Sequence, residues 1–331
     1  MDKVSEPLQM RVGSLPGGTT VRSEATAARF AAAAPRSSLL VDLFATLRPE
    51  QWTKNLIVFA ALIFARRLFD MSALVVSGAA FLVFCALSGV VYLVNDVMDR
   101  ESDRRHPLKC RRPIASGALS AQTAWIAAVT LAALALGAAW VISPLFAAIA
   151  LAYLTLMSLY SGLFKRMVIL DVLSIAIGFV MRAIAGGIVI AVPISQWLLV
   201  CTILLALFLA LAKRRHELVL LADGATEHRQ ILAEYSPYLL DQMISVVTAS
   251  VVTAYIFYAI SPETVQKFDT NLLGLTIPFP LYGIFRYLYL VHQKKEGGSP
   301  AAMLLNDRPL LTCVVLWVAV VVVIIYRPFG G

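Results

Sequence analysis

Nine apolar blocks recur along this chain, and they limit its fold more than any other feature. Most contain about twenty residues, the length that a helix needs to cross the hydrocarbon layer of a bilayer. Of the 331 residues, 60% are hydrophobic and only 15% are charged, too few charges to cover a soluble protein of this size. We therefore predict an all-α fold, a polytopic membrane bundle of nine transmembrane helices. The blocks lie at approximately residues 55–69, 72–94, 121–142, 144–162, 167–191, 196–212, 240–260, 272–291 and 309–326.

The chain divides by composition into two parts. Residues 1–45 are rich in Ala, Ser, Thr, Gly and Arg and contain no sustained apolar run, which predicts a disordered cytoplasmic tail. Residues 46–331 form the predicted nine-helix catalytic domain. Within it, Ser143-Pro144 separates two blocks, because proline breaks a helix. The four cysteines and four histidines lack the spacing of metal ligands, so they predict neither a zinc site nor a disulfide framework.

The Lys and Arg residues between the blocks predict the orientation of the bundle. If the first block starts on the cytoplasmic side, the inner segments hold 17 of these residues and the outer segments hold 4. Such an excess is typical of cytoplasmic loops. We therefore predict a multi-pass protein of a bacterial-type cytoplasmic membrane, with its active site facing the cytoplasm. The net charge of +8 then indicates cationic loops and anionic substrates or lipids, and no nucleic-acid partner.

Three carboxylates and an amide follow directly after the second block. Asp96, Asp99 and Asp103 are spaced i, i+3 and i+7, so on a helix they project from one face, with Asn95 beside them. Carboxylates this close repel one another, and the bilayer adds a desolvation cost. Hard oxygen ligands suit Mg²⁺, which shares its other positions with water and substrate phosphates. The alternative is a solvated face beside the membrane, but the position at the end of a membrane helix favours a Mg²⁺–diphosphate site.

The pattern of Asn95, Asp96, Asp99 and Asp103, followed by Arg111-Arg112-Pro113, resembles the first Asp-rich motif of the UbiA superfamily of intramembrane prenyltransferases. The resemblance extends from about residue 48 to the C-terminus. It implies a nine-helix protein that binds a Mg²⁺–diphosphate over a cytoplasmic mouth.

The chain departs from the aromatic prenyltransferases of this superfamily after the sixth block. Those enzymes carry a second Asp-rich motif there, whereas this chain has Ala212-Lys213-Arg214-Arg215-His216-Glu217. Cations in place of carboxylates predict that phosphate oxygens are held directly, by charge and by bidentate hydrogen bonds. Lys54, in Gln51-Trp52-Thr53-Lys54-Asn55, opens the first block and is a further candidate for a phosphate, together with the N–H groups of the helix start.

Two more cations allow both a functional and a structural interpretation. Lys165 closes the segment that begins at Tyr160, and its alternative is an ordinary cationic loop end. Arg182 lies inside the fifth block, where a charge is costly unless it pairs with a carboxylate or a phosphate. Because Asp171 and Arg182 share one helix face, the alternative for Arg182 is a structural ion pair with Asp171 or with another acidic residue.

Taken together, these segments are similar to the decaprenyl-phosphate phosphoribosyltransferase branch of the superfamily. The resemblance implies a Mg²⁺-dependent membrane glycosyltransferase of cell-envelope biosynthesis, which transfers 5-phosphoribosyl from 5-phosphoribosyl 1-diphosphate to a polyprenyl phosphate. Mg²⁺–diphosphate is assigned to Asn95, Asp96, Asp99 and Asp103, and the donor's phosphates to Arg111, Arg112, Lys165 and Arg182. Lys54 and Lys213 are assigned to the lipid phosphate or the 5-phosphate, Glu217 to the metal or a ribose hydroxyl, and Asn55 and Tyr160 to substrate binding.

Two other functions compete with this one. A prenyltransferase that moves a polyprenyl group from its diphosphate to an aromatic acceptor would share the first acidic motif, but it predicts the second one, which is missing. A secondary transporter would place its polar residues near the bilayer midplane, whereas here most lie at the ends of the blocks. The sequence does not distinguish a monomer from a homo-oligomer.

Overall fold

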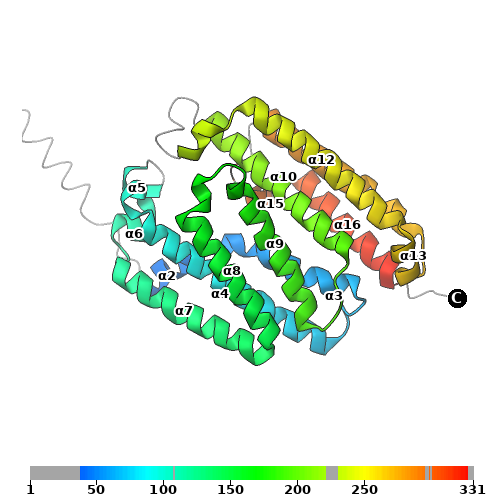
Figure 1. Cartoon of the computed structure of the whole chain (residues 1–331), viewed down its shortest axis with the longest axis horizontal. Helices are drawn as coiled ribbons and strands as arrows, with labels where there is room; N and C mark the ends of the chain where they lie inside the picture. The colour runs from blue at the N-terminus through cyan, green and yellow to red at the C-terminus, as the bar shows by residue number, and fades with distance from the viewer. Residues whose placement is uncertain (1–37, 107–108, 221–229, 295–297, 299, 327–331) are drawn as a thin grey trace, which may run out of the picture. The chain divides into compact units, whose positions relative to one another are not determined.

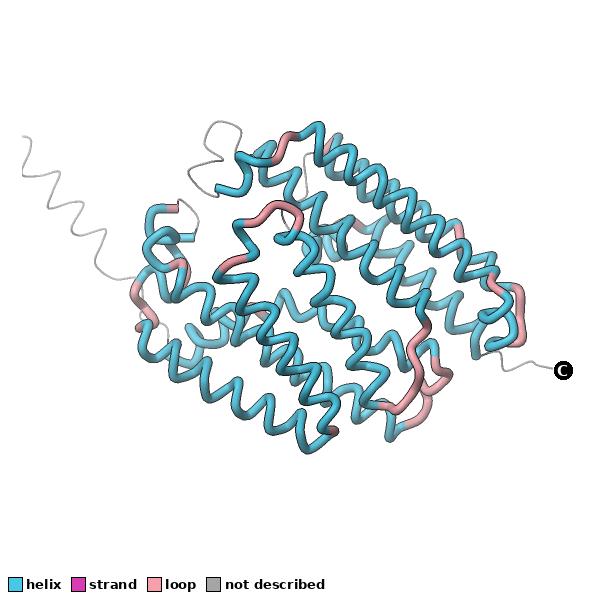
Figure 2. The backbone as a smooth tube through the Cα atoms, viewed as in Figure 1, coloured by secondary structure: helices cyan, strands magenta, loops and turns pink. Residues whose placement is uncertain are grey.

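The computed structural model describes residues 38–106, 109–220, 230–294, 298 and 300–326. Figure 2 shows that every regular element in these ranges is a helix. The predicted all-α class is therefore confirmed for this part of the chain. The predicted tail lies almost entirely outside the described residues.

Within the described ranges, seven helices are long and apolar enough to cross a membrane. Figure 1 shows α4, α7, α8 and α9 beside one another, and α10 and α12 continue the arrangement beyond α9. The seventh, α16, packs against the shorter α14. The seven are α4 (Met71–Met98), α7 (Ala121–Ile142), α8 (Pro144–Gly162), α9 (Leu170–Val189), α10 (Gln196–Leu220), α12 (Pro237–Ile260) and α16 (Arg308–Tyr326).

Shorter helices connect the long ones, and several of them carry the polar residues of interest. The short α-helices are α2 (Leu39–Leu47), α3 (Ala60–Phe64), α5 (Arg100–Arg105), α6 (Pro113–Ser116), α13 (Pro262–Phe268), α14 (Pro278–His292) and α15 (Pro300–Asn306). The 3-10 helices are η1 (Pro49–Phe59), η2 (Lys109–Arg111), η3 (Phe164–Arg166), η4 (Gln230–Glu234) and η5 (Leu272–Thr276).

Within the described residues, two of the nine predicted spans are interrupted. The predicted count of nine spanning helices is therefore not confirmed. The block at 55–69 starts as the 3-10 helix η1, continues as α3, and ends in a turn in which Arg66 has a φ of 59°. The block at 272–291 is divided between η5 and α14, since Pro278 starts a new helix. A helix of 15 residues such as α14 extends only about 22 Å, short of the roughly 30 Å hydrocarbon layer.

The helical unit begins earlier than the predicted boundary at residue 46. It starts at Leu39, with α2. This helix forms because its apolar side chains have a partner: Leu43 and Leu47 pack onto the cluster built by Val90 and Leu93 of α4. Nine residues are too few to be recognised as a membrane span, so from sequence alone this stretch falls in the predicted tail.

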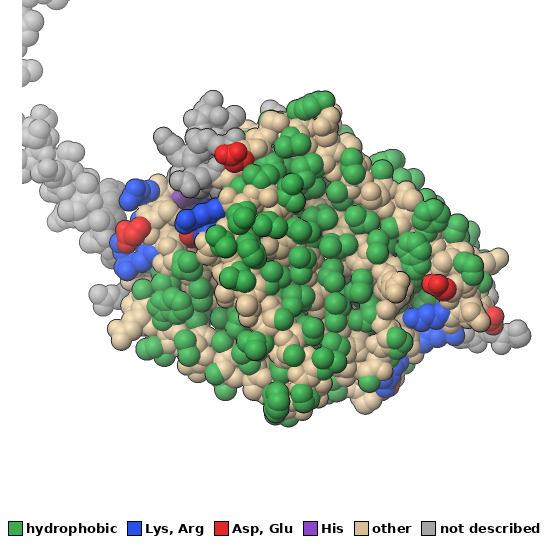
Figure 3. All heavy atoms as spheres, in the orientation of Figure 1, with side chains coloured by type: hydrophobic (Ala, Val, Ile, Leu, Met, Phe, Trp, Pro, Cys, Tyr) green, Lys and Arg blue, Asp and Glu red, His purple; other side chains and the backbone are tan. Residues whose placement is uncertain are grey.

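The break predicted at Ser143-Pro144 is confirmed. Ser143 has extended backbone and its hydroxyl accepts a hydrogen bond from the N–H of Phe146, so it caps α8, while Pro144 occupies the first turn. Figure 3 shows charged side chains gathered at the two ends of the helices and hydrophobic side chains over the face between them. This distribution is that of a multi-span membrane protein.

Candidate active site

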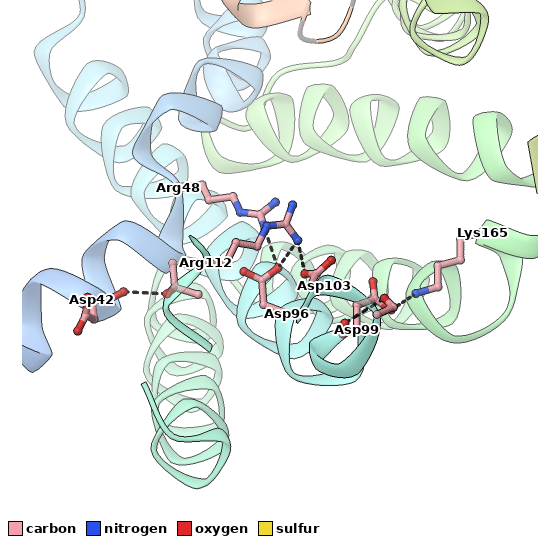
Figure 4. A network of polar contacts seen from close by, with 9 residues as sticks. Asp42, Arg48, Asp96, Asp99, Asp103, Arg112 and Lys165 are labelled. Atoms are coloured by element: carbon pink, nitrogen blue, oxygen red, sulfur yellow. Dashed lines mark hydrogen bonds and ion pairs between the residues drawn. The ribbon is translucent and has the colours of Figure 1, made fainter. Parts of the chain in front are cut away.

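Two buried carboxylates meet at a single guanidinium at the end of α4 (Figure 4). Asp96 lies in the last turn of α4 and Asp103 in α5. Nη1 of Arg112, the residue before α6, donates to Asp103 Oδ2 at 2.6 Å and to Asp96 Oδ1 at 3.1 Å. Arg48, which precedes η1, donates to the same oxygen of Asp96 at 2.6 Å. The chain therefore folds back twice to bring two arginines to two carboxylates.

The third carboxylate of the motif points elsewhere. Asp99 caps the end of α4, between α4 and α5, and its Oδ1 accepts a hydrogen bond at 2.9 Å from Lys165 of η3. Figure 4 shows Asp99 directed toward Lys165, away from Arg112. Asp99 therefore pairs with a cation of a different element from the one that joins Asp96 and Asp103, which the spacing of the three carboxylates did not predict.

The two carboxylates that meet at Arg112 suit a Mg²⁺ ion that is bound jointly by the protein and a substrate phosphate. Within the described part of the chain, no three acidic, His or Cys side chains form a group that could hold a metal by themselves. Mg²⁺ needs only one or two carboxylates when substrate phosphates and water complete its octahedron. Asp96 and Asp103 meet that requirement, since both already converge on one cationic nitrogen.

Three cations lie near Lys54 of η1, namely Arg48 just before η1, Arg182 of α9 and Lys213 of α10. Burial, and after it the neighbouring charges of Lys213, Arg182 and Arg48, together lower the pKa of Lys54 to about 7. The Lys54 ammonium has neither a hydrogen bond nor an ion pair with any described residue. We call Arg48, Lys54, Arg182 and Lys213 the cation cluster. Uncompensated positive charge of this kind attracts an anion.

Arg182 is buried without an acidic partner among the described residues. Its guanidinium donates to Asn55 Oδ1 at 2.7 Å, to the Tyr153 hydroxyl at 2.7 Å and to the carbonyl of Gly178 at 2.9 Å, and it lies 4.6 Å from the Tyr153 ring centroid. All of these groups are neutral. The alternative of an ion pair between Arg182 and Asp171 is therefore wrong, and Asn55 is buried as a partner of Arg182.

Of the three consecutive cations on α10, two are engaged by acidic residues of the protein. Arg214 is 2% exposed and pairs with Asp171 and with Glu217, each at 2.6 Å. Arg215 points the other way and pairs with Asp241 of α12. Successive residues of a helix face different directions, so carboxylates engage Arg214 and Arg215 closely, whereas Lys213 has only a 3.8 Å contact with Glu217.

The remaining predicted residues lie around these groups. Glu217 lies 3.8 Å from the Lys213 ammonium, and the Tyr160 hydroxyl accepts a 3.3 Å hydrogen bond from Arg214. Arg111 is exposed on η2, and Asn95 is half-buried in the last turn of α4. Sequence reasoning missed Arg48 and Tyr153 as members of the site. Arg48, beside Pro49, was counted only as a loop charge, and a tyrosine inside an apolar block gives no local signal.

Comparisons with known proteins agree with this architecture. Residues 55–307 match the model of the UbiA prenyltransferase family. A relative from Corynebacterium glutamicum, named decaprenyl-phosphate phosphoribosyltransferase, is 32% identical over 88% of this chain and 89% of its own length. One of the same name from Mycolicibacterium smegmatis is 32% identical over 89% of this chain and 95% of its own length.

Solved structures show the same fold at lower identity. The structure of a UbiA homologue from Archaeoglobus fulgidus, bound to DMAPP and Mg²⁺, has a TM-score of 0.67 and 18% identity, covering 86% of this chain and 99% of that chain. At that identity the likeness concerns the fold alone, whereas the family match covers most of the sequence. The chain therefore belongs to the UbiA prenyltransferase family.

Proposed function

We propose that this chain is a membrane phosphoribosyltransferase. It transfers the 5-phosphoribosyl group from 5-phosphoribosyl 1-diphosphate to a polyprenyl monophosphate and releases diphosphate. A phosphate oxygen of the lipid forms a bond to the anomeric carbon, and the bond from that carbon to the diphosphate breaks. The names of two relatives, each 32% identical over most of the chain, support this activity.

The structural observation that carries the proposal is the cation cluster, which lies beside the acidic pair. Asp96 and Asp103 serve one diphosphate, as any diphosphate-using enzyme of this family requires. The cluster adds Lys54, Arg182 and Lys213, none of which has a close ion pair in the described residues except the 3.8 Å contact of Lys213 with Glu217. A reaction between two phosphorylated substrates needs such fixed charge to offset their repulsion, whereas a neutral aromatic acceptor does not.

The acidic pair and its arginines would hold the donor's diphosphate. Asp96 and Asp103 would bind Mg²⁺, and Mg²⁺ supplies Lewis-acid neutralisation of a departing diphosphate. Arg48 and Arg112 already reach these carboxylates, so their remaining N–H groups are placed to donate to diphosphate oxygens. Asn95, Asp99, Lys165 and Arg111 line the same end and would complete the contacts.

The cation cluster would hold a phosphate monoester, either that of the lipid or the donor's 5-phosphate. Lys54 and Lys213 would contact its oxygens, and Arg182, held in place by Asn55 and Tyr153, would add positive charge behind Lys54. A phosphate monoester is already an anionic nucleophile near neutral pH, so no strong general base is required. Glu217 of α10 lies beside Lys213, and Tyr160 lies beside Arg214, so both would meet the ribose of the donor.

We also propose that this end of the bundle faces the cytoplasm in a bacterial cytoplasmic membrane. The donor is water-soluble, whereas the polyprenyl chain of the acceptor stays within the bilayer. The excess of Lys and Arg residues in the segments at this end supports that orientation.

The experiment that tests the function offers two substrate pairs to the purified protein in lipid. With Mg²⁺, radiolabelled 5-phosphoribosyl 1-diphosphate and polyprenyl phosphate should give a labelled lipid and one diphosphate for each transfer. Polyprenyl diphosphate with an aromatic acceptor should give no product. Transfer with the second pair and none with the first would replace the proposal by aromatic prenyl transfer.

A further inference from the structure

A buried ion pair joins α9 to α10 beside the candidate active site. Asp171, in the first turn of α9, is fully buried, and its Oδ2 accepts a 2.6 Å hydrogen bond from Nε of Arg214. Arg214 also binds Glu217, which in turn lies 3.8 Å from Lys213. The pair therefore fixes the rotation of α10 that turns Lys213 toward Lys54.

Tyr235 is a further hydrogen-bond partner of Asp171, and it connects the ion pair to the turn between α8 and α9. Its hydroxyl donates to Asp171 Oδ1 at 2.8 Å and accepts a 2.8 Å hydrogen bond from the N–H of Ile169. The side chain is 5% exposed and comes from the segment between η4 and α12. The Tyr235 hydroxyl thus donates one hydrogen bond to α9 and accepts another from the turn that precedes α9.

The backbone that Tyr235 holds at Ile169 is strained. Ile169 has a φ of 68° and a ψ of −44°, and the N–H of Leu170 bonds to the carbonyl of Val168 at 2.8 Å, which is a γ-turn. A β-branched residue rarely adopts positive φ, and such conformations persist only where the surroundings impose them. Here the hydrogen bond from the Ile169 N–H to Tyr235 is the contact that imposes it.

The same turn carries Lys165, which lies four residues before Ile169 and pairs with Asp99. We propose that Tyr235 is a positioning residue: through Ile169 it fixes the turn that presents Lys165, and through Asp171 and Arg214 it fixes α10. This inference rests on the proposed function, which supplies the ligand that Lys165 would contact, a Mg²⁺–diphosphate. Tyr235 itself touches no predicted substrate.

The chain contains a matched control for a test of Tyr235. Tyr287 belongs to the same apolar cluster as Tyr235 and is also buried, but its hydroxyl has no hydrogen-bond partner among the described residues. Tyr235→Phe removes two hydrogen bonds and keeps the ring, whereas Tyr287→Phe removes a hydroxyl that makes none. Both variants should melt within a few degrees of the wild type, since both retain the packed ring.

The first measurement is the affinity of the purified protein for inorganic diphosphate in the presence of Mg²⁺, with the ligand-induced shift of the melting temperature as the readout. We expect Tyr235→Phe to weaken binding about fivefold, the change that one neutral hydrogen bond supports. We expect Tyr287→Phe to bind like the wild type. Equal affinities of the two variants would overturn the inference.

The second measurement is a double-mutant cycle with Lys165→Gln. If Tyr235 acts through the turn, Lys165→Gln should cost less affinity in the Tyr235→Phe background than in the wild type. It should cost the same in the Tyr287→Phe background. Additive losses in the Tyr235→Phe background would show a merely structural role and overturn the inference.

The two proposals fail separately. If the protein turns over 5-phosphoribosyl 1-diphosphate but Tyr235→Phe binds diphosphate like Tyr287→Phe, only the positioning role is lost. If no phosphoribosyl transfer occurs but the coupling between Tyr235 and Lys165 is measured, the positioning role stands and the proposed substrates do not. A wild type that does not bind Mg²⁺–diphosphate would overturn both.

Discussion

Lys54 is the residue whose charge depends most directly on its surroundings. Partial burial and three neighbouring cations bring its pKa to about 7, far below the usual value for lysine. Without a bound anion, the Lys54 ammonium therefore loses its proton as the pH rises through neutrality. A bound anion favours the ammonium, so binding and protonation are linked.

The first prediction follows from the sign of this linkage. Affinity for a soluble phosphate monoester such as ribose 5-phosphate, measured in detergent from pH 7.5 to 8.5, should fall as the pH rises, by up to about tenfold if only the ammonium binds. A phosphate monoester is already mostly dianionic in this range, since its second pKa is about 6. Lys54→Arg should flatten the profile, because arginine stays protonated. A flat wild-type profile would contradict the assignment of Lys54.

Asp99 gives the second prediction at this scale. Asp99→Asn removes the carboxylate that pairs with Lys165 and should strongly lower turnover while leaving the fold intact, because the Lys165 ammonium loses the charged partner that holds it at the diphosphate end. Asp269→Asn is the matched control: Asp269 is exposed and has a φ of 52°, which asparagine adopts readily. Wild-type turnover in Asp99→Asn would show that this carboxylate has no part in holding the donor.

Sequence reasoning could find the site's charged residues but not their partners. The spacing of Asp96 and Asp103 predicted a shared location, and the structure places both at Arg112. Whether Arg182 meets Asp171 or a neutral group depends on how α9, α8 and η1 pack, which spacing along one helix does not contain. Tyr235 was missed for the same reason, since it reaches Asp171 from 64 residues away.

At the scale of elements, the contact between η1 and α9 brings Lys54 and Arg182 together. η1 approaches α9 at Gly186, where an added Cβ would lie 2.1 Å from the carbonyl oxygen of Val58. That contact is with backbone, so η1 would have to move as a whole. The glycine is therefore needed for close approach and not for its conformational freedom.

Gly186→Ala should consequently destabilise the protein by about 1–3 kcal/mol, as overpacking of a tight contact does, and should also lower turnover by displacing Lys54. Gly137→Ala is the control, since an added Cβ on α7 meets nothing within 4 Å and alanine favours a helix. Thermal melting in detergent and a turnover assay measure both effects. Equal melting temperatures for the two variants would contradict the close approach.

Element boundaries were predictable where a cap or proline marks them and not elsewhere. Ser143-Pro144 defines the start of α8 in the sequence and in the structure. The 3-10 geometry of η1 has no such marker, because its composition is that of an ordinary amphipathic segment. Within η1, Val58 approaches Gly186 of α9 closely, a contact between distant segments that local sequence does not mark.

At the scale of the whole molecule, hydropathy predicted the class of fold but overestimated the number of uninterrupted spans. Seven helices within the described ranges meet the length and hydropathy of a span, and α3 and α14 are the shortened remainders of two further blocks. An apolar block indicates that a segment is buried or faces lipid, but it does not indicate whether the segment forms one continuous helix. Packing explains why the broken segments are still apolar: Leu62 of α3 and Ile284 of α14 are both buried in clusters of the bundle.

The orientation of the bundle gives the last prediction. Met71, 70% exposed, begins α4, and Ala118 lies exposed in the turn before α7, so a single crossing of α4 separates them. In a chain whose four cysteines are replaced, a membrane-impermeant maleimide should label Met71→Cys in intact cells. It should label Ala118→Cys only after the membrane is opened, because Ala118 lies at the end that carries the acidic pair and the excess of Lys and Arg. The cysteine-free chain supplies the background, and the reverse pattern of labelling would place the site on the outer face, where a water-soluble donor made in the cytoplasm does not reach it.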